Sequence, residues 1–272
     1  MIISDLHTHT TYCDGKNTPE EMLSAAIEKG LKIYGLSSHA HLKYDESWNM
    51  SFAAQQKYVD EICALRQKYN GKIEVLLGIE YDLYSDSDII PFDYVIGSCH
   101  TVIKDGAYIS VDESEAVYTE CVNRFYGGDS YALVKDYYSL ISNACDMVDC
   151  TFFGHFDLVN KFNRNFKFFD ENDRRYTEPM YAALEKLAKT KKPFELNTAA
   201  TYRHNPDLAT ASAVKWLSAL SEMGGNIIIN SDAHRAEDIG KGFAKAEALA
   251  KQCGFKRILT LTSHGFEENY LN

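Results

Sequence analysis

The chain has 272 residues, of which 45% are hydrophobic and 25% charged, so the composition excludes fibrous and disordered proteins. Its formal net charge of -11 argues against a nucleic-acid partner, because binding to a phosphate backbone needs clustered basic residues. No apolar run is long enough to span a membrane, and the first residues lack the pattern of a signal peptide. We therefore expect a cytoplasmic protein with no membrane partner, whose seven cysteines, without CxxC spacing, are reduced.

Short apolar runs alternate with longer helical segments along the whole chain. Strands are expected at residues 2–7, 33–37, 73–80, 94–99, 150–155, 193–198 and 227–231, with an eighth apolar run at 257–262. Helices are expected at residues 19–29, 52–69, 130–142 (leading toward 147), 178–189, 212–223 and 240–253. Repeated βα units with continuously apolar strands are typical of a parallel barrel. The sequence therefore predicts an α/β fold, a TIM-like barrel that forms a single domain over residues 1–272.

Residues 101–129 interrupt this alternation. The segment is polar and aromatic, with a small hairpin expected around residues 104–107 and no long helix. An insertion after a strand lies over the active face of a barrel, which favours a lid or a substrate-contacting loop. The alternative is a surface loop with no function.

Six of the nine histidines stand at or just after the ends of different predicted strands. They are His7, His9, His39, His100, His155 and His234, and the carboxylates Asp14, Glu80 and Asp232 lie at or near the same ends. Taken singly, each could be a packed or solvated residue. In a parallel barrel, however, all these ends open onto one face, and His7 and His9 are two residues apart on one side of a strand. The pattern predicts a metal site.

The other three histidines lack this support. His41 is a spare ligand or a contact to substrate or solvent, because it lies beyond its strand in a loop. His204 and His264 are not expected in the metal site.

Several motifs in order resemble those of the PHP (polymerase and histidinol phosphatase) superfamily. They are His7-Thr8-His9 with Asp14, the histidine after the second strand, Gly78-Ile79-Glu80, Gly97-Ser98-Cys99-His100, Gly154-His155-Phe156-Asp157 and Ser231-Asp232-Ala233-His234. In length and in the excursion after His100, the chain is most similar to the stand-alone histidinol-phosphate phosphatases. The resemblance implies a distorted seven-stranded barrel, in which the run 257–262 is not a regular barrel strand.

The resemblance also implies three divalent metal ions. The first would be held by His7, His9, Glu80 and Asp232, the second by Glu80, His100 and His155, and the third by Asp14, His39 and His234. Imidazole and carboxylate ligands suit Zn²⁺, Mn²⁺ or Fe²⁺, and the sequence does not choose among the three.

The implied activity is hydrolysis of a small phosphate monoester, histidinol phosphate in histidine biosynthesis, by a metal-activated hydroxide. The sequence contains no motif for a protein nucleophile or a phosphate loop. We expect Asp232 or His234 to protonate the leaving alcohol.

Basic side chains are expected to bind the phosphate. Arg203 and Lys161 occupy positions where the related phosphatases carry basic ligands, and Arg164 could replace Lys161 as a bidentate donor. Each could instead be an exposed base. Ser38 departs from a frequently acidic position of the family, which removes the basis for a role there. Asp112, Glu113 and Glu115 are available for the amine and imidazole of histidinol.

Two other functions remain open. The chain could be a PHP phosphoesterase that acts on another small phosphate ester or on nucleic-acid 3′ ends, although its acidic charge opposes the latter. It could also be a metal-binding module without activity, although its complete set of ligands opposes this.

Overall fold

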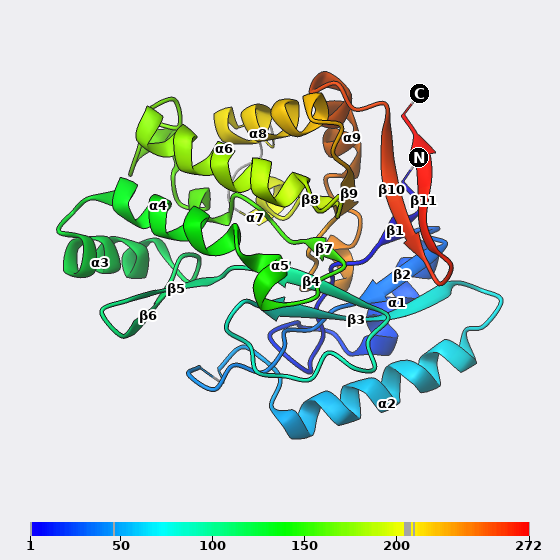
Figure 1. Ribbon diagram of the computed structural model, residues 1–272. Helices are drawn as coiled ribbons and strands as arrows, with labels where there is room; N and C mark the ends of the chain where they lie inside the picture. The colour runs from blue at the N-terminus through cyan, green and yellow to red at the C-terminus, as the bar shows by residue number, and fades with distance from the viewer. Residues whose placement is uncertain (1, 46, 204–207, 209, 272) are drawn as a thin grey trace.

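Seven parallel strands form one sheet whose spatial order is the order of the chain. A computed structural model describes residues 2–45, 47–203, 208 and 210–271. The strands are β1 (Ser4–Asp5), β2 (Ile33–Leu36), β3 (Glu74–Asp82), β4 (Tyr94–Ser98), β7 (Phe152–Phe153), β8 (Phe194–Asn197) and β9 (Ile227–Asn230). The sheet curls until its ends meet, where Thr8 and Ala233 form a parallel bridge (Figure 1). The predicted seven-stranded barrel is confirmed.

Two of the strands are much shorter than predicted. β1 and β7 have two residues each, because side chains replace part of the backbone ladder. The Leu6 amide donates to Asn230 Oδ1 at 2.9 Å, and the Ser231 amide donates to Asp5 Oδ1 at 3.0 Å. Beyond β1, the His9 amide donates to the Ala233 carbonyl at 2.9 Å, so backbone pairing resumes where the predicted ligands lie.

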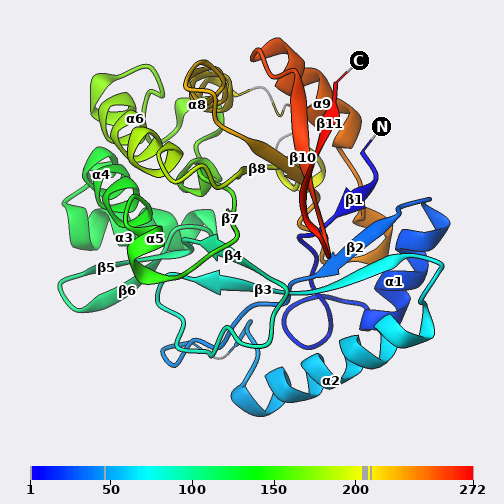
Figure 2. The ribbon, with the colours of Figure 1, turned by 45° about the vertical axis from the view of Figure 1, so that its right-hand side comes forward.

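Helices cover the outside of the barrel (Figure 2). They are α1 (Pro19–Glu28), α2 (Phe52–Lys68), α4 (Ser130–Ile141), α5 (Ala144–Met147), α6 (Arg174–Ala188), α8 (Ala211–Glu222) and α9 (Phe243–Gln252), with a short α7 (Ala200–Arg203) and the 3₁₀ turns η1 (Leu158–Asn160), η2 (Arg164–Phe166) and η3 (Ala236–Asp238). A capping box between Thr18 and Glu21 starts α1. α6 begins four residues before the predicted start at 178, because the Asp173 side chain caps it by accepting from the Arg175 amide.

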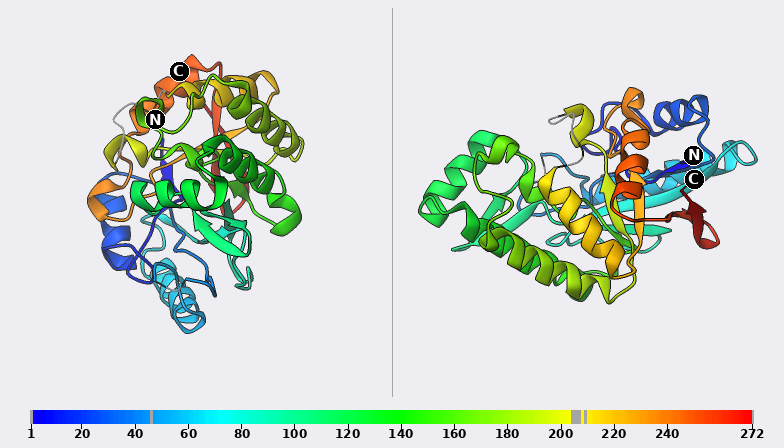
Figure 3. Two further views of the ribbon diagram at one scale, coloured as in Figure 1. Left: turned by 90° about the vertical axis from the view of Figure 1, so that its left-hand side faces the viewer. Right: turned by 90° about the horizontal axis from the view of Figure 1, so that it is seen from above.

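The last apolar run does not join the barrel. β10 (Arg257–Thr262) pairs antiparallel with β11 (Gly265–Tyr270) in a separate two-stranded sheet. This agrees with the expectation that residues 257–262 are not a regular barrel strand. The two chain ends lie close together beside this hairpin (Figure 3).

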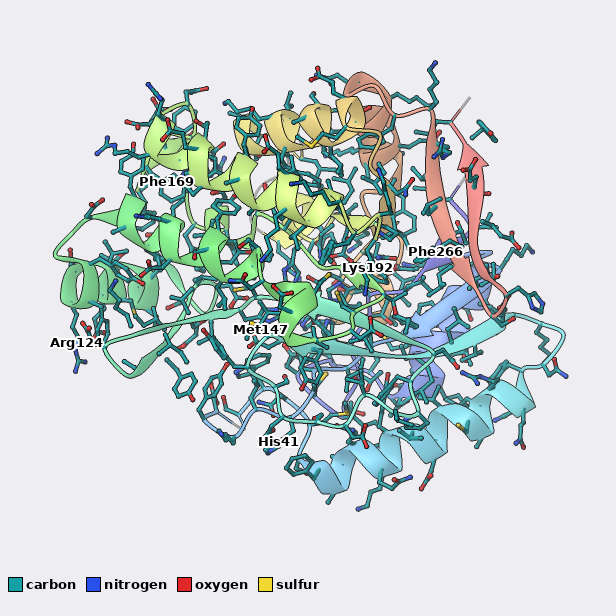
Figure 4. All side chains as sticks on the ribbon, in the orientation of Figure 1. His41, Arg124, Met147, Phe169, Lys192 and Phe266 are labelled. Atoms are coloured by element: carbon teal, nitrogen blue, oxygen red, sulfur yellow. The ribbon has the colours of Figure 1, made fainter. Side chains whose placement is uncertain are left out.

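The segment 101–129 forms the expected hairpin and also a helix that we did not expect. β5 (Thr101–Lys104) pairs with β6 (Ala107–Ser110), and α3 (Glu115–Tyr126) follows with 12 residues. The prediction of no long helix was wrong because Tyr118, Val122 and Tyr126, four residues apart, present one buried face that the polar composition obscures. Arg124 on the opposite side of α3 points away from the barrel (Figure 4).

Tyr94 fills the barrel interior. It is 1% exposed, and its hydroxyl donates to the Leu6 carbonyl at 2.6 Å across the barrel. A Cβ at Gly35 or Gly78 would lie within 2.2 Å of the Tyr94 ring or hydroxyl, so both positions require glycine. Such packing in the interior leaves the strand ends as the place for a site.

Candidate metal centre

The nine predicted ligands meet at the carboxyl ends of the strands. Seven of them line a cavity of about 1140 Å³, whereas His7 and His9 are fully buried among the others. Backbone pairing beyond the strands brings them together. Ala233 accepts from the His9 amide, and Glu80 and His39 form a parallel bridge. Residues up to 227 positions apart in the chain, His7 and His234, thus share one site.

A first group consists of His7, His9, Glu80 and Asp232. The Nε2 atoms of His7 and His9 lie 3.0 and 3.4 Å from Glu80 Oε2. His9 Nε2 is also 3.2 Å from Asp232 Oδ1. Asp232 has a φ of 53°, a strained conformation for a residue other than glycine that persists only where its surroundings hold it.

A second group forms around the other oxygen of Glu80. His155 Nε2 lies 2.9 Å and His100 Nε2 3.3 Å from Glu80 Oε1. Glu80 therefore faces both groups, each with a different carboxylate oxygen.

A third group holds Asp14, His39 and His234. His234 Nε2 is 2.9 Å from Asp14 Oδ2, and His39 Nε2 is 3.8 Å from Asp14 Oδ1. This group is less separate than the resemblance implied. His9 lies within reach of it, and His39 Nδ1 is 3.0 Å from Glu80 Oε2.

The donor set fits divalent metal ions. Four buried atoms of the cluster have no partner in hydrogen-bond geometry within the described part of the chain, even where a neighbour is close: His7 Nε2, His9 Nε2, Asp14 Oδ1 and Glu80 Oε2. Buried polar atoms are rarely left in this state, and such atoms need an explanation such as an ion. Imidazole nitrogens and carboxylate oxygens are the donors that transition metals take.

The protonation states of Glu80 and His9 also favour metal binding. Burial by itself would raise the pKa of Glu80, but His7, His39 and His100 hold that pKa well below its ordinary value. Burial lowers the pKa of His9 to about 3, and His234 and His39 act in the same direction. Glu80 is thus ionised and His9 neutral, which are the states in which each binds metal, whereas, against the effect of burial, neighbouring carboxylates raise the pKa of His7 and His100, whose protons a bound metal would displace.

Glu195 supports the ligands from behind, and our reading of the sequence missed it. Its wholly buried carboxylate accepts from His7 Nδ1 at 2.8 Å and from the His155 amide at 3.0 Å. Asn230 and Asn197 also donate to it. This bond to Nδ1 turns His7 Nε2 toward the cluster. The sequence offered one indication of its role, because Glu195 is the one charged residue in the predicted strand 193–198.

Asp82 and Trp48 were missed as well. Asp82 Oδ2 accepts from the His100 amide at 2.8 Å. The Trp48 ring stands edge-on to His39, with 4.6 Å between ring centroids, and lines the cavity. Trp48 comes from a loop after β2, where no strand-end pattern could indicate it.

The three predicted phosphate-binding residues all line the cavity. Arg203 lies nearest to the ligands: its Nη2 donates to the Asp232 carbonyl at 2.7 Å and contacts His234 Nδ1. Lys161 forms an ion pair with Asp112, whereas Arg164 is exposed at the cavity wall.

The other candidates for contact with the substrate are three acidic residues of the segment 101–129 and His41. Asp112 and Glu113 line the cavity, but Glu115 does not: it is exposed and pairs with Lys167. His41 lies near the start of α2, where Nδ1 is 2.7 Å from Asp86 Oδ1 (Figure 4).

His264 is not part of the cluster, because it lies in the turn between β10 and β11. His204, which the sequence also does not place in the metal site, lies outside the described residues. Seven side chains of the segment 101–129 line the cavity, as a substrate-contacting loop would: Thr101, Tyr108, Ser110, Asp112, Glu113, Val117 and Cys121.

Comparison with known proteins agrees with this geometry. The PHP domain family matches residues 5–199. The probable histidinol-phosphatase of Deinococcus radiodurans is 30% identical over 269 residues, which cover 94% of this chain and 95% of that protein. The histidinol-phosphatase of Bacillus subtilis is 24% identical and covers 92% of this chain and 98% of its own.

A solved structure shares the fold. Histidinol phosphate phosphatase from Lactococcus lactis, complexed with zinc, L-histidinol and phosphate, is 22% identical with a TM-score of 0.69, over 97% of this chain and 98% of that one.

In the part of the chain that the structure describes, no helix is both long and apolar enough to cross a membrane.

Proposed function

The chain belongs to the PHP domain family, and from this we propose that it is a metal-dependent phosphatase that converts histidinol phosphate to histidinol and phosphate. The observation that carries the proposal is Glu80, a buried carboxylate that lines the cavity and whose two oxygens face two different sets of histidines. The substrate follows from the similarity along nearly the whole chain to proteins named for that reaction.

We infer that three divalent ions of zinc, manganese or iron are held by the three groups of ligands. When bound, such ions supply a hydroxide at neutral pH and neutralise charge on the phosphoryl oxygens. Three divalent ions carry six positive charges against the three carboxylates Asp14, Glu80 and Asp232. The cavity then attracts a phosphate although the whole chain has a net charge of -11.

The residues around the cluster have distinct tasks. Arg203 binds and orients the phosphate, since its guanidinium lies beside Asp232 and His234. Lys161 and Arg164 are the further cationic groups of the cavity wall. In the hydrolysis, a P–O bond forms to the oxygen from water while the P–O bond to the alcohol breaks. Asp232 or His234, at the edge of the cluster, gives the leaving oxygen its proton.

A nuclease function has less support. The relative that acts on DNA, DNA polymerase/3′-5′ exonuclease PolX of Bacillus subtilis, matches over 44% of this chain and 22% of its own. An assay with a 3′-labelled single strand separates this function from phosphatase activity. An inactive metal-binding module would leave Asp232→Ala without effect on phosphate release.

The deciding experiment measures metal content and phosphate release on protein purified without chelators. We expect about three metal ions for each chain and release of phosphate from histidinol phosphate. Rapid hydrolysis of other phosphate esters without release from histidinol phosphate would refute the proposed substrate. A content near one ion, together with full activity of His39→Ala, would refute the three-ion arrangement.

A further inference from the structure

An ion pair stands in the wall of the cavity next to the second group of ligands. Lys161 Nζ donates to Asp112 Oδ2 at 3.1 Å, and the two side chains are 19% and 23% exposed. Both line the same cavity as Glu80, His100 and His155. A substrate that binds in this cavity at the metal ligands can therefore contact the ion pair.

Backbone contacts anchor each partner of the pair beside a ligand. The Val111 amide donates to the His100 carbonyl at 2.9 Å, which holds Asp112 next to His100. The Leu158 amide donates to the His155 carbonyl at 3.0 Å, and the Lys161 amide to the Leu158 carbonyl at 2.9 Å. Thus the pair is built from the two segments that follow His100 and His155.

The other carboxylates of the cavity wall that are not metal ligands are engaged differently. Asp157 Oδ2 accepts from the Ser212 hydroxyl, and Glu171 accepts from Asn163 Nδ2 and the Ser212 amide. Asp45 accepts from the Ser47 hydroxyl and from Trp48 Nε1, which occupies both of its oxygens. Glu113 is exposed. Asp112 Oδ2 binds the cation Lys161, and among the described residues the other bond to this carboxylate from a side chain is a weak contact of 3.3 Å between the Ser110 hydroxyl and Oδ1.

We propose that Asp112 is a specificity-determining residue that binds an ammonium group placed next to the phosphate ester of the substrate. The inference rests on the proposed function and narrows it to esters that carry an amine. Lys161 leaves Asp112 and turns to the phosphate, while the ammonium takes its place on Asp112 Oδ2. One ion pair becomes two, and no charge is left without a partner.

The chemistry of the substrate agrees with the position of the pair. In histidinol phosphate the amine is three bonds from the ester oxygen, so the two atoms lie within about 4 Å of each other. The ammonium must therefore bind close to the reacting phosphate, beside the ligands, where Asp112 is. An ester without the amine draws Lys161 to its phosphate and leaves a half-buried carboxylate unpaired, which is unfavourable.

The test compares histidinol phosphate with 3-(imidazol-4-yl)propyl phosphate, which lacks only the amine. kcat/KM for both esters is measured with the metal-loaded wild type, Asp112→Asn and Glu115→Gln. Glu115→Gln is the matched control, because it removes a carboxylate paired with a lysine in the same insertion but outside the cavity. Thermal unfolding of each variant reports on its folding.

We expect the wild type and Glu115→Gln to prefer histidinol phosphate by about 10- to 100-fold, less than for a fully buried polar contact because Asp112 is partly exposed. Asp112→Asn should lose most of this preference, with kcat/KM for the propyl ester changed less than about threefold. A parallel fall for both esters would overturn the proposal, since a structural role predicts it.

A wild type that hydrolyses both esters equally would also overturn the proposal, even if Asp112→Asn did not fold. This result would leave the phosphatase function standing. A wild type that releases no phosphate from either ester would instead refute the proposed function itself.

Discussion

Replacing Glu195 by glutamine should weaken metal binding without touching any metal ligand. Four donors converge on this carboxylate: His7 Nδ1 at 2.8 Å, Asn230 Nδ2 at 2.9 Å, Asn197 Nδ2 at 3.0 Å and the His155 amide at 3.0 Å. His7 and Asn230 share Oε1, and the other two share Oε2. In glutamine an NH₂ group, which is itself a donor, replaces one of these oxygens. Whichever way the amide is oriented, two of the four donors therefore lose their acceptor.

The cost can be worked from these contacts. Each hydrogen bond to a charged group contributes about 1.5–3 kcal/mol, so losing two of them lowers the free energy of unfolding by about 3–6 kcal/mol. The bond that orients His7 is lost or weakened as well. Loss of such a supporting carboxylate typically reduces metal affinity by about 10- to 100-fold.

The assay is titration of zinc against a competing chelator, combined with urea unfolding of the metal-free protein. Glu120→Gln, an exposed site on α3, is the matched control and should leave both quantities unchanged. Wild-type zinc affinity in Glu195→Gln would refute the reasoning that this carboxylate orients His7.

Three further predictions concern the core, the cluster and a thiol. Gly78→Ala should lower the free energy of unfolding by about 3 kcal/mol, because its Cβ would lie 2.0 Å from the Tyr94 ring; a loss under about 0.5 kcal/mol in urea would contradict this packing. Chelation should lower the melting temperature by about 5–10 °C with helical circular dichroism unchanged, since metal at 100 times its Kd adds about 2.7 kcal/mol; an unchanged melting temperature would speak against a bound ion. A hydrogen bond from Cys150 and the positive Lys192 lower the pKa of the Cys145 thiol to about 7, although burial opposes this. Alkylation at Cys145 should therefore rise with pH to half its maximum near pH 7, and Lys192→Met should move this midpoint upward; a midpoint unmoved by the variant would show that Lys192 has no such effect.

Much of the candidate site could be predicted because a parallel barrel converts position along the chain into position in space. His100 and His155 are 55 residues apart, yet both follow strands whose ends open on one face. Alternation along a strand likewise places His7 and His9 on one side. The set of nine residues needed only the strand pattern and the resemblance that their order supports.

Contacts between segments could not be predicted in this way. Glu115 and Asp112 are three residues apart and chemically alike, but the fold turns one toward Lys167 outside the cavity and the other toward Lys161 inside it. α3 was missed for a related reason: its buried face exists only because the hairpin and α4 pack against it.

The sequence alone determined the alternation of strands and helices, the barrel and the face on which the ligands gather, because these follow from local periodicity and the direction of each strand. Only the tertiary structure decided which oxygen of Glu80 faces which histidine, and that Glu195 supports His7. It also decided that Asp112 and Lys161 meet beside the ligands. Such pairings depend on strand register and loop packing, which are set by the whole folded chain rather than by any local pattern.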